Sequence, residues 1–296
     1  MKSNIKYTNP VGVSRYTGLL LILPFIIGSL VLTMYPFAAS FIFGMTDSRS
    51  GEMVFTGLGN YRSLLSDPDF IDSALVTLKY AAILVPLKLA VSLFIALLLS
   101  IELRGIGVWR TIFYIPSILG SGLAVMIMWQ FLFTSGGLVN QLLVLCGLSP
   151  VSWYGDSRYS IYIIVLLRLW ESGSAMLIFL NALKGIPREY YEAAKVDGCG
   201  NIRGFFRITL PLIRNAVFLN LVLQTISALQ EFSAPYMLTG GGPMKSTYTV
   251  GMLIYNEMFR FGDTGYANAV SWGLFVVITA AVAVLFRLTG RLSEEI

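Results

Sequence analysis

Residues 189–211 read EYYEAAKVDGCGNIRGFFRITLP and form a polar segment between two long apolar runs. Pro187 just before it suits the first position of a helix, and Glu189 in the first turn complements the helix dipole. Gly198 is the expected helix end, and Asn201 can cap a second short helix that leads into the next apolar run. The segment therefore predicts a helix, a sharp turn and a second helix.

The rest of the chain is strongly apolar. Of its 296 residues, 56% are hydrophobic and 12% are charged, and the mean hydropathy is +0.73. Six runs are long enough to cross a hydrocarbon core, which takes about 20 residues. We expect an all-α integral membrane protein with six transmembrane helices in a domain at 16–288. The spans lie near 16–43, 75–100, 111–133, 160–183, 212–238 and 267–288, with cytoplasmic segments at 1–15, 184–211 and 289–296.

The positions of the basic residues predict the orientation. Lysines and arginines outside the spans concentrate at the N-terminus, around Arg104 and Arg110, in the 184–214 region and at the C-terminus. Because basic residues are retained on the cytoplasmic side, this pattern places both termini in the cytoplasm. The basic residues are not interleaved with exposed aromatic residues, so a nucleic-acid partner is not expected.

Several classes of catalytic and metal site are excluded by composition. The chain has no histidine, which removes Ser-His-Asp and Cys-His catalysis and histidine metal sites. Cys146 and Cys199 fall on opposite sides of the predicted membrane, without metal-ligand spacing. The motif GGPMKST at 241–247 resembles the end of a phosphate-binding loop, but Met244 replaces a required glycine. We predict no catalytic residue, no metal site and no cofactor in this chain.

Polar residues within the spans are candidate functional groups, because burying them in lipid is costly. Trp and Glu in LWESGSAM (169–176), and Gln, Glu and Phe in LQEFSAPY (229–236), combine hydroxyl-binding groups with aromatic faces that suit sugars. The candidate substrate-binding residues are Trp170, Glu171, Gly173, Gln230, Glu231 and Phe232. Two structural alternatives stay open: Arg168 and Glu171 can simply pair with each other, and Gly173 with Ser172 can serve close helix packing.

The polar segment carries a family resemblance. It contains E-A-A, three residues, G, nine residues and I-x-L-P, which resembles the cytoplasmic EAA loop of bacterial ABC importer permeases. The stretches GLGNYRSLLSDPDFIDSALVTLKY (57–80) and LTGGGPMKSTYTVGMLIYNEMFRFGDTGYANAVSWGLF (238–275) are similar to carbohydrate permeases of the maltose F type. The ATPase-coupling residues that the resemblance implies are Tyr191, Glu192, Ala193, Ala194, Asp197, Gly198, Ile208, Leu210 and Pro211.

The resemblance implies a type I ABC importer permease fold in the bacterial inner membrane. It also implies a second, G-type permease, two cytoplasmic ATPase subunits that bind ATP and Mg, and an external solute-binding protein that delivers a carbohydrate. Taken from the residues alone, the helix of the polar segment can equally lie on the bilayer surface. An ion-coupled carrier that uses Lys88 or Glu231, and a membrane-embedded enzyme that uses Glu171 and Glu231, are the alternative functions.

Overall fold

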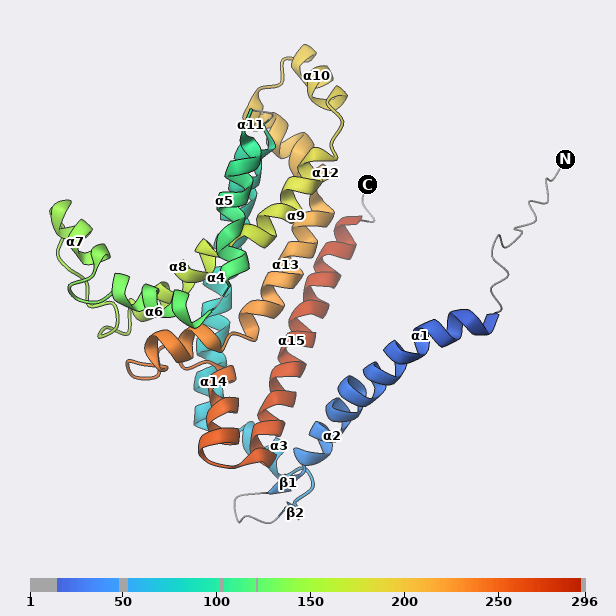
Figure 1. The fold of residues 1–296 in the computed structure, drawn as a ribbon, viewed down its shortest axis with the longest axis vertical. Coiled ribbons are helices and arrows are strands. Elements are labelled where there is room, and N and C mark those ends of the chain that lie inside the picture. The colour runs from blue at the N-terminus through green and yellow to red at the C-terminus, as the bar shows by residue number, and fades with distance from the viewer. Residues whose placement is uncertain (1–14, 48–52, 102–103, 121, 294–296) are drawn as a thin grey trace.

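The computed structural model describes residues 15–47, 53–101, 104–120 and 122–293. The predicted cytoplasmic segment 1–15 falls almost wholly outside these ranges, as does the end of the predicted tail 289–296. The described chain is an elongated helical bundle with a single antiparallel pair of two-residue strands, β1 (Thr46–Asp47) and β2 (Val54–Phe55), at one end. The polar segment forms the opposite end of the bundle (Figure 1).

Three continuous helices are long and apolar enough to span a membrane. The first runs over Leu20–Phe43 and joins α1 (Arg15–Ser29), the π-helical turn η1 (Leu30–Met34) and α2 (Tyr35–Phe43). The second is α4 (Pro68–Ser100), and the third is Thr264–Leu288 within α15 (Thr264–Ser293). The start of α4 follows from its sequence: Asp67 accepts a hydrogen bond from the backbone N–H of Asp69 at 3.0 Å, and Pro68 occupies the first position.

Three further spans are bent pairs of helices. The pair α5 (Ile106–Leu119) and α6 (Leu123–Leu132) bends by 103°, and the pair α8 (Ser160–Trp170) and α9 (Gly173–Lys184) by 45°. The third pair consists of Asn201–Leu212 and α13 (Arg214–Leu229), and it bends by 70°. Its first part is made of α11 (Asn201–Gly204), η2 (Phe205–Thr209) and α12 (Leu210–Leu212). Counting each pair as one span confirms the all-helical fold with six spans.

Two of these spans, at 111–133 and 160–183, were expected to be unbroken, whereas a separate short helix beginning at Asn201 was expected before the span at 212–238. The break after α5 lies beside Gly120, whose φ of +57° is readily adopted only by glycine. The break after α8 is at Glu171 and Ser172, where a charged and a small polar residue interrupt the apolar run. The expected span at 212–238 ends as a regular helix at Leu229, before a turn and the π-helical segment η3 (Pro235–Thr239).

Helix α4 is the centre of the bundle and packs against α8, α9 and α13. Tyr80 and Leu84 of α4 contribute to one core cluster with the α8 residues around Ile164. Ala96 of α4 and Phe179 of α9 belong to a second cluster nearer the polar segment. Because lipid tails are as apolar as these side chains, the clusters stabilise the fold through close van der Waals packing, and α4 and α9 should form the most stable part of the chain.

The strand end of the bundle is closed by α3 (Gly59–Leu64), α14 (Val250–Tyr255), the π-helical turn η4 (Asn256–Arg260) and the start of α15. A side chain at Gly265 would collide with the backbone oxygen of Thr46, so this glycine permits the close approach of β1 to α15. Trp272 of α15 packs on Phe37 of α2, with ring centroids 4.7 Å apart. These contacts fix the α2 end of the first span.

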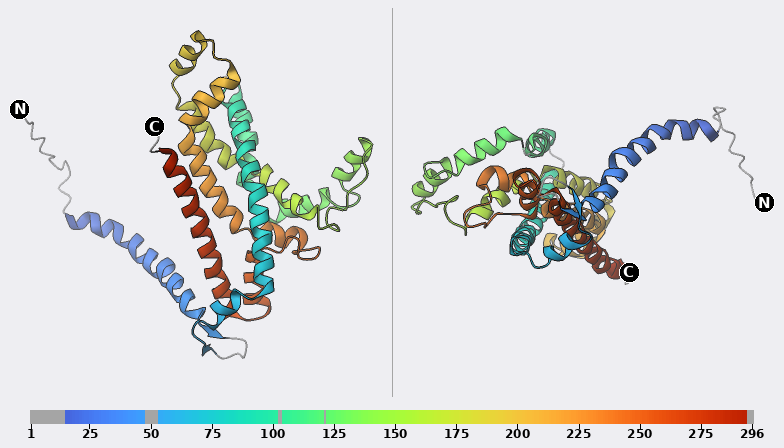
Figure 2. Two further views of the ribbon diagram at one scale, coloured as in Figure 1. Left: turned by 180° about the vertical axis from the view of Figure 1, so that it is seen from behind. Right: turned by 90° about the horizontal axis from the view of Figure 1, so that it is seen from below.

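The α1 end of the first span lies away from the bundle (Figure 1). In both Figure 1 and Figure 2, α1 diverges from the other helices, and its apolar side chains, such as Leu21 and Phe25, are each 76% exposed. Figure 1 shows α7 (Leu138–Leu145) projecting from the opposite side of the molecule.

Buried Asn140 organises the segment that carries α7. Its amide nitrogen donates to the backbone oxygens of Thr134, Ser135 and Val151, and its amide oxygen accepts from the backbone N–H of Val151 and from Trp153 Nε1. One side chain therefore joins the segment before α7 to the segment that follows it.

Two substitutions in this segment should have opposite outcomes. Asn140→Ala leaves a buried N–H and several carbonyls without partners and should lower the free energy of unfolding by about 1–3 kcal/mol or more. The Tyr154 hydroxyl is buried and has no hydrogen-bond partner among the described residues, and burial raises the pKa of Tyr154 to about 12. Tyr154→Phe should therefore leave stability unchanged or increase it. Thermal unfolding in detergent of both variants measures this, and a stability loss in Tyr154→Phe equal to that of Asn140→Ala would contradict the assignment.

Candidate functional site

The polar segment folds into a short helix with a glycine-terminated end. Helix α10 (Glu189–Val196) is followed by Gly198 at φ +73°. The N–H of Cys199 donates to the Ala194 oxygen at 2.8 Å, and the N–H of Gly198 donates to the Lys195 oxygen at 3.1 Å. This pair of bonds is a Schellman motif, which needs a residue in the left-handed conformation at the glycine position. The predicted helix and sharp turn are therefore both present.

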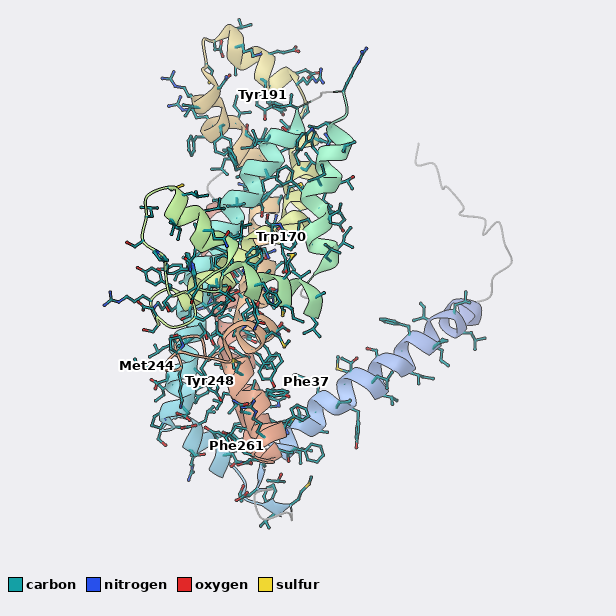
Figure 3. The ribbon with its side chains drawn as sticks, turned by 60° about the vertical axis from the view of Figure 1, so that its left-hand side comes forward. Phe37, Trp170, Tyr191, Met244, Tyr248 and Phe261 are labelled. Atoms are coloured by element: carbon teal, nitrogen blue, oxygen red, sulfur yellow. The ribbon has the colours of Figure 1, made fainter. Side chains whose placement is uncertain are left out.

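Helix α10 presents two different faces. Tyr191, Ala194 and Lys195, which are three or four residues apart, line a cavity on the side of the bundle. Glu189, Glu192 and Ala193 are exposed and do not line it, and neither does Tyr190, which is 54% exposed. Figure 3 shows Tyr191 at this end of the molecule. The exposed face lies free in a single chain and is available to another protein.

One hydrogen bond fastens α10 to the following helix. The hydroxyl of Tyr191 lies 2.9 Å from that of buried Thr209, in η2. Of the remaining predicted coupling residues, Asp197 caps the end of α10 and Ile208 lines the same cavity, while Leu210 and Pro211 open α12. The structure thus brings the nine predicted coupling residues together in one hairpin, which the Tyr191–Thr209 hydrogen bond holds together.

A second constellation lies between the two bent spans. Arg168, near the end of α8, donates from Nη1 to Glu171 Oε2 at 2.6 Å, which confirms the pair expected from their spacing. It also donates from Nε and Nη2 to the two carboxylate oxygens of Glu231, each at 2.7 Å. The side chains are only 12% (Arg168), 9% (Glu171) and 7% (Glu231) exposed. Arg168 thus joins the break in one bent span to the segment that follows α13.

Glu231 makes further contacts that fix its position. Its carboxylate also accepts from the Tyr80 hydroxyl at 3.4 Å and from the backbone N–H of Ala234 at 3.2 Å. Its backbone oxygen accepts from Thr249 Oγ1 at 2.8 Å. With four donors on its carboxylate, Glu231 is a structural anchor in this conformation.

Glu171 and Lys88 are less completely paired. The second carboxylate oxygen of Glu171 is buried and has no hydrogen-bond partner among the described residues. Lys88 on α4 is half-buried and close enough to interact electrostatically with Arg168, Glu171 and Glu231. The charges of these four residues cancel, so the constellation as a whole is neutral and does not by itself favour an anionic substrate.

The other predicted substrate-binding residues are distributed over this region. Trp170 is 36% exposed, its ring centroid lies 5.8 Å from that of Trp129, and Figure 3 shows it near the middle of the molecule. Gly173 is buried where an added side chain would collide with the backbone of Phe113, so it serves the close packing of α9 on α5. Gln230 is exposed at the end of α13.

Phe232 begins a ladder of aromatic rings. Its centroid lies 5.2 Å from that of Tyr236 and 5.1 Å from that of Tyr255. Tyr236 and Tyr255 are 4.9 Å apart, and Phe259 follows at 5.2 Å from Tyr255. We call these four residues the aromatic ladder. It extends from Glu231 to η4, where Phe259 is 70% exposed.

Three features of this site were not predicted from the sequence. The Arg168–Glu231 contact joins residues 63 positions apart. Glu171, three residues from Arg168, already gave the arginine a partner nearby, so nothing in the sequence required a second one. Tyr80 was not distinguished from other aromatic residues of an apolar span. The ladder includes Tyr255, which lies in a stretch quoted only for its family resemblance; no signal in the sequence linked it to Phe232.

The chain is similar to known transport proteins. Residues 105–294 match the family described as binding-protein-dependent transport system inner membrane component. A probable ABC transporter permease protein, YesP of Bacillus subtilis (strain 168), is 36% identical and is matched over 96% of this chain and 93% of its own. The trehalose/maltose transport system permease protein MalF of Thermococcus litoralis is 34% identical, over 94% and 95%.

The fold is similar to that of solved structures. A bacterial ABC transporter involved in the import of the acidic polysaccharide alginate contains a chain with a TM-score of 0.81 at 22% identity. The superposition covers 93% of this chain and 96% of that one.

Proposed function

This chain belongs to the family of binding-protein-dependent transport system inner membrane components, and from that membership we propose how it imports a carbohydrate. It is an inner-membrane permease subunit of an ABC importer for carbohydrates and carries out transport, with ATP hydrolysis on a separate subunit. The observation that carries the mechanism is the exposed face of α10, held in place by the Schellman turn at Gly198 and the Tyr191–Thr209 bond.

We propose that this face docks on an ATPase subunit. A short helix with small residues at Ala193 and Ala194 beside the exposed ring of Tyr190 suits a groove on a partner. Two such ATPase subunits would bind ATP and Mg, and their closure would move the hairpin and the bent spans attached to it. Both termini of this chain would then lie in the cytoplasm.

A second permease of the G type would cover the exposed first span. The described apolar side chains of α1 are largely exposed in this chain, and membrane helices associate through packing against one another. The pathway would run between the two permeases, with an external solute-binding protein that delivers the sugar at the strand end. Isolated chain in liposomes should therefore show no saturable sugar flux; such flux would overturn the need for partners.

Uptake driven by ATP separates this function from an ion-coupled carrier. Cells that carry the complete system should lose uptake of a radiolabelled oligosaccharide substrate when ATP is depleted. They should keep it when an uncoupler collapses the proton gradient at constant ATP. The opposite pattern would favour a carrier that uses Lys88 or Glu231.

For the substrate path, we propose that Trp170 and the aromatic ladder contact sugar rings, while Glu231 holds the path in shape. Aromatic faces cover the apolar side of a sugar, and the hydroxyls of Tyr236 and Tyr255 offer hydrogen bonds. Glu171 has one carboxylate oxygen left for a sugar hydroxyl once the bent spans move apart.

Tyr255→Ala should reduce sugar uptake without loss of the assembled complex. The substitution removes the ring that contacts the other three of the ladder and costs about 1–3 kcal/mol of sugar binding, or roughly a tenfold or greater rise in the half-saturating concentration. Phe131→Ala is the matched control, because Phe131 is 71% exposed and lies outside the ladder. Uptake kinetics in Tyr255→Ala that equal those of the control would remove the ladder from the path.

A further inference from the structure

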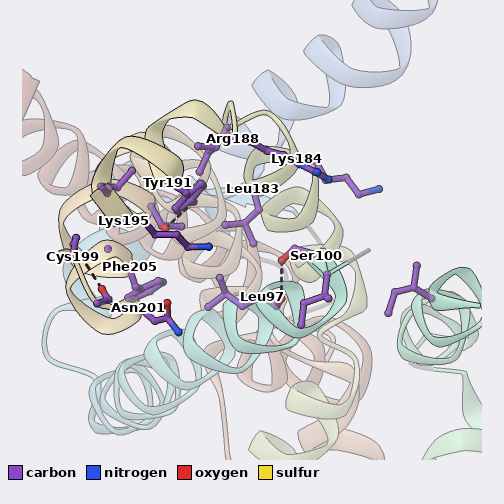
Figure 4. Close-up of a pocket in the computed structure, with 18 of the residues that line it drawn as sticks. Leu97, Ser100, Leu183, Lys184, Arg188, Tyr191, Lys195, Cys199, Asn201 and Phe205 are labelled. Atoms are coloured by element: carbon purple, nitrogen blue, oxygen red, sulfur yellow. Dashed lines mark hydrogen bonds between the residues drawn. The ribbon is translucent and has the colours of Figure 1, made fainter. Parts of the chain in front are cut away.

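The cytoplasmic hairpin encloses a cavity of about 1380 Å³ on its bundle side (Figure 4). The walls come from the end of α4, the start of α5, the end of α9 and the hairpin from α10 to η2. It is separate from the Arg168 constellation and from the aromatic ladder, because none of their residues lines it. The proposed transport mechanism leaves this space without a role.

The cavity is positively charged. Five basic residues line it, and no Asp or Glu does so among the described residues; the five are Arg104, Arg110, Lys184, Arg188 and Lys195. Figure 4 shows the Lys195 side chain extending from α10 into the space. Arg110 is held in place by two bonds from its guanidinium to the Leu99 oxygen, at 2.8 and 3.2 Å. Charges of one sign around a concave site concentrate positive potential and attract an anion.

The distribution of charge on α10 distinguishes this cavity from the docking face. Lys195 points to the cavity side, whereas the acidic residues Glu189 and Glu192 are on the exposed side. If the basic residues only marked the cytoplasmic side of the membrane, they would have no reason to converge on one space. The helix therefore has one face for a protein and one face for an anion.

The cavity also has an apolar wall at the membrane end. Leu97, Ile101, Ile106, Leu183 and Ile186 contribute to its lining. Basic pockets between transmembrane helices on the cytoplasmic side bind the headgroups of anionic lipids. We propose that the cavity binds an anionic phospholipid of the cytoplasmic leaflet. The basic residues hold its phosphate, and its acyl chains extend along the apolar wall.

A bound lipid would fix the hairpin relative to the bilayer. The phosphate would bridge α10, through Lys195, to the ends of α9 and α5, through Lys184 and Arg110. Movement of the ATPase subunits would then be transmitted to the bent spans through a stiffer hairpin. The importer should consequently couple ATP hydrolysis to transport better in a bilayer that contains anionic lipid.

The experiment compares two double variants of the complete complex. Lys184→Gln with Lys195→Gln removes two charges from the cavity. Arg203→Gln with Arg207→Gln removes two charges from exposed positions of the same hairpin that do not line it. Each complex is placed in nanodiscs of phosphatidylcholine with or without phosphatidylglycerol. Retained phosphatidylglycerol is counted by native mass spectrometry, and ATPase activity stimulated by the binding protein is measured.

The wild type and the Arg203/Arg207 variant should retain phosphatidylglycerol and show several-fold higher stimulated activity in discs that contain it. The Lys184/Lys195 variant should lose most of the retained lipid and that stimulation. Equal retention in both variants overturns the proposal. Full activation of the wild type by inorganic phosphate in phosphatidylcholine discs also overturns it, because the cavity would then take a free anion. Lipid retention is measured without sugar, so its failure leaves the carbohydrate function standing.

Discussion

Arg168→Met should destabilise the chain more than any other single substitution in the bundle. It leaves the buried carboxylates of Glu171 and Glu231 facing each other without their shared cation, and Lys88 is the remaining nearby positive charge. Removing one partner of a buried ion pair costs about 3–5 kcal/mol. We expect the variant to yield little folded chain in detergent and little assembled complex, measured by size-exclusion chromatography and thermal unfolding.

Two further variants make this prediction specific. Arg158→Met removes an exposed arginine from the loop before α8 and should change stability by less than about 1 kcal/mol. Neutralising the carboxylates as well, with Glu171→Gln and Glu231→Gln in the Arg168→Met background, should recover much of the lost stability. If Arg168→Met were as stable as Arg158→Met, the constellation would not hold the bent spans together.

Glu231→Gln should cause a smaller loss of stability than Arg168→Met, for the same reason. The amide cannot accept both charged hydrogen bonds from Arg168 as a carboxylate does, and it leaves Arg168 with Glu171 as its anionic partner. Folded yield should fall along with uptake. Retention of full stability with lost uptake would instead indicate that Glu231 binds substrate directly.

Gly198→Asp should uncouple the transporter. Gly198 has a positive φ, in which a residue with a side chain costs about 1–2 kcal/mol, although Asp and Asn tolerate it better than others. A side chain there meets nothing within 4 Å in this chain, so we expect the added carboxylate to act chiefly on the ATPase that we propose docks against the turn. We expect at least a tenfold loss of ATPase retention on the purified complex, with a matching loss of sugar uptake.

A series at this position separates charge from backbone strain. Gly198→Asn adds a similar side chain without charge and should retain most of the coupling, whereas Gly198→Val tests strain alone and should weaken the turn. Gly107→Asp is the control, since it adds the same carboxylate at an open position near the start of α5. Should Gly198→Asp bind the ATPase and import sugar as well as Gly107→Asp does, the hairpin is not the coupling element.

The fold was predictable because lipid imposes strong constraints on sequence. Backbone groups in a bilayer must be satisfied within helices, so long apolar runs identify the spans. The bends were not predictable from hydropathy, because Glu171 and Ser172 barely lower the average over a span that also contains Ile163 and Phe179. A bend depends on whether a neighbouring helix supplies partners for the freed polar groups, and here Ser92 of α4 lies near the Ser172 oxygen, at 3.5 Å.

The site was predictable where its residues are close in sequence. The helix and turn of the hairpin follow from Glu189, Gly198 and their spacing, because caps and dipole effects are local. The bidentate contact of Arg168 with Glu231 depends on how α8 and α13 pack, and the packing of two helices cannot be derived from a single sequence. Because Glu171 was a sufficient predicted partner for Arg168, there was no reason in the sequence to expect Glu231 as a second partner.

The exposed first span also affects how the amounts of the two permease subunits in the membrane are matched. Among the described residues, the leading helix contacts its own bundle mainly at its α2 end, for example through Trp272 with Phe37 and Ser40, and its α1 end stays exposed until a second subunit arrives. We expect membrane proteases to degrade a chain whose helix stays unassembled. The chain should therefore be degraded rapidly when synthesised alone, so that its abundance in the membrane is set by the supply of its partner.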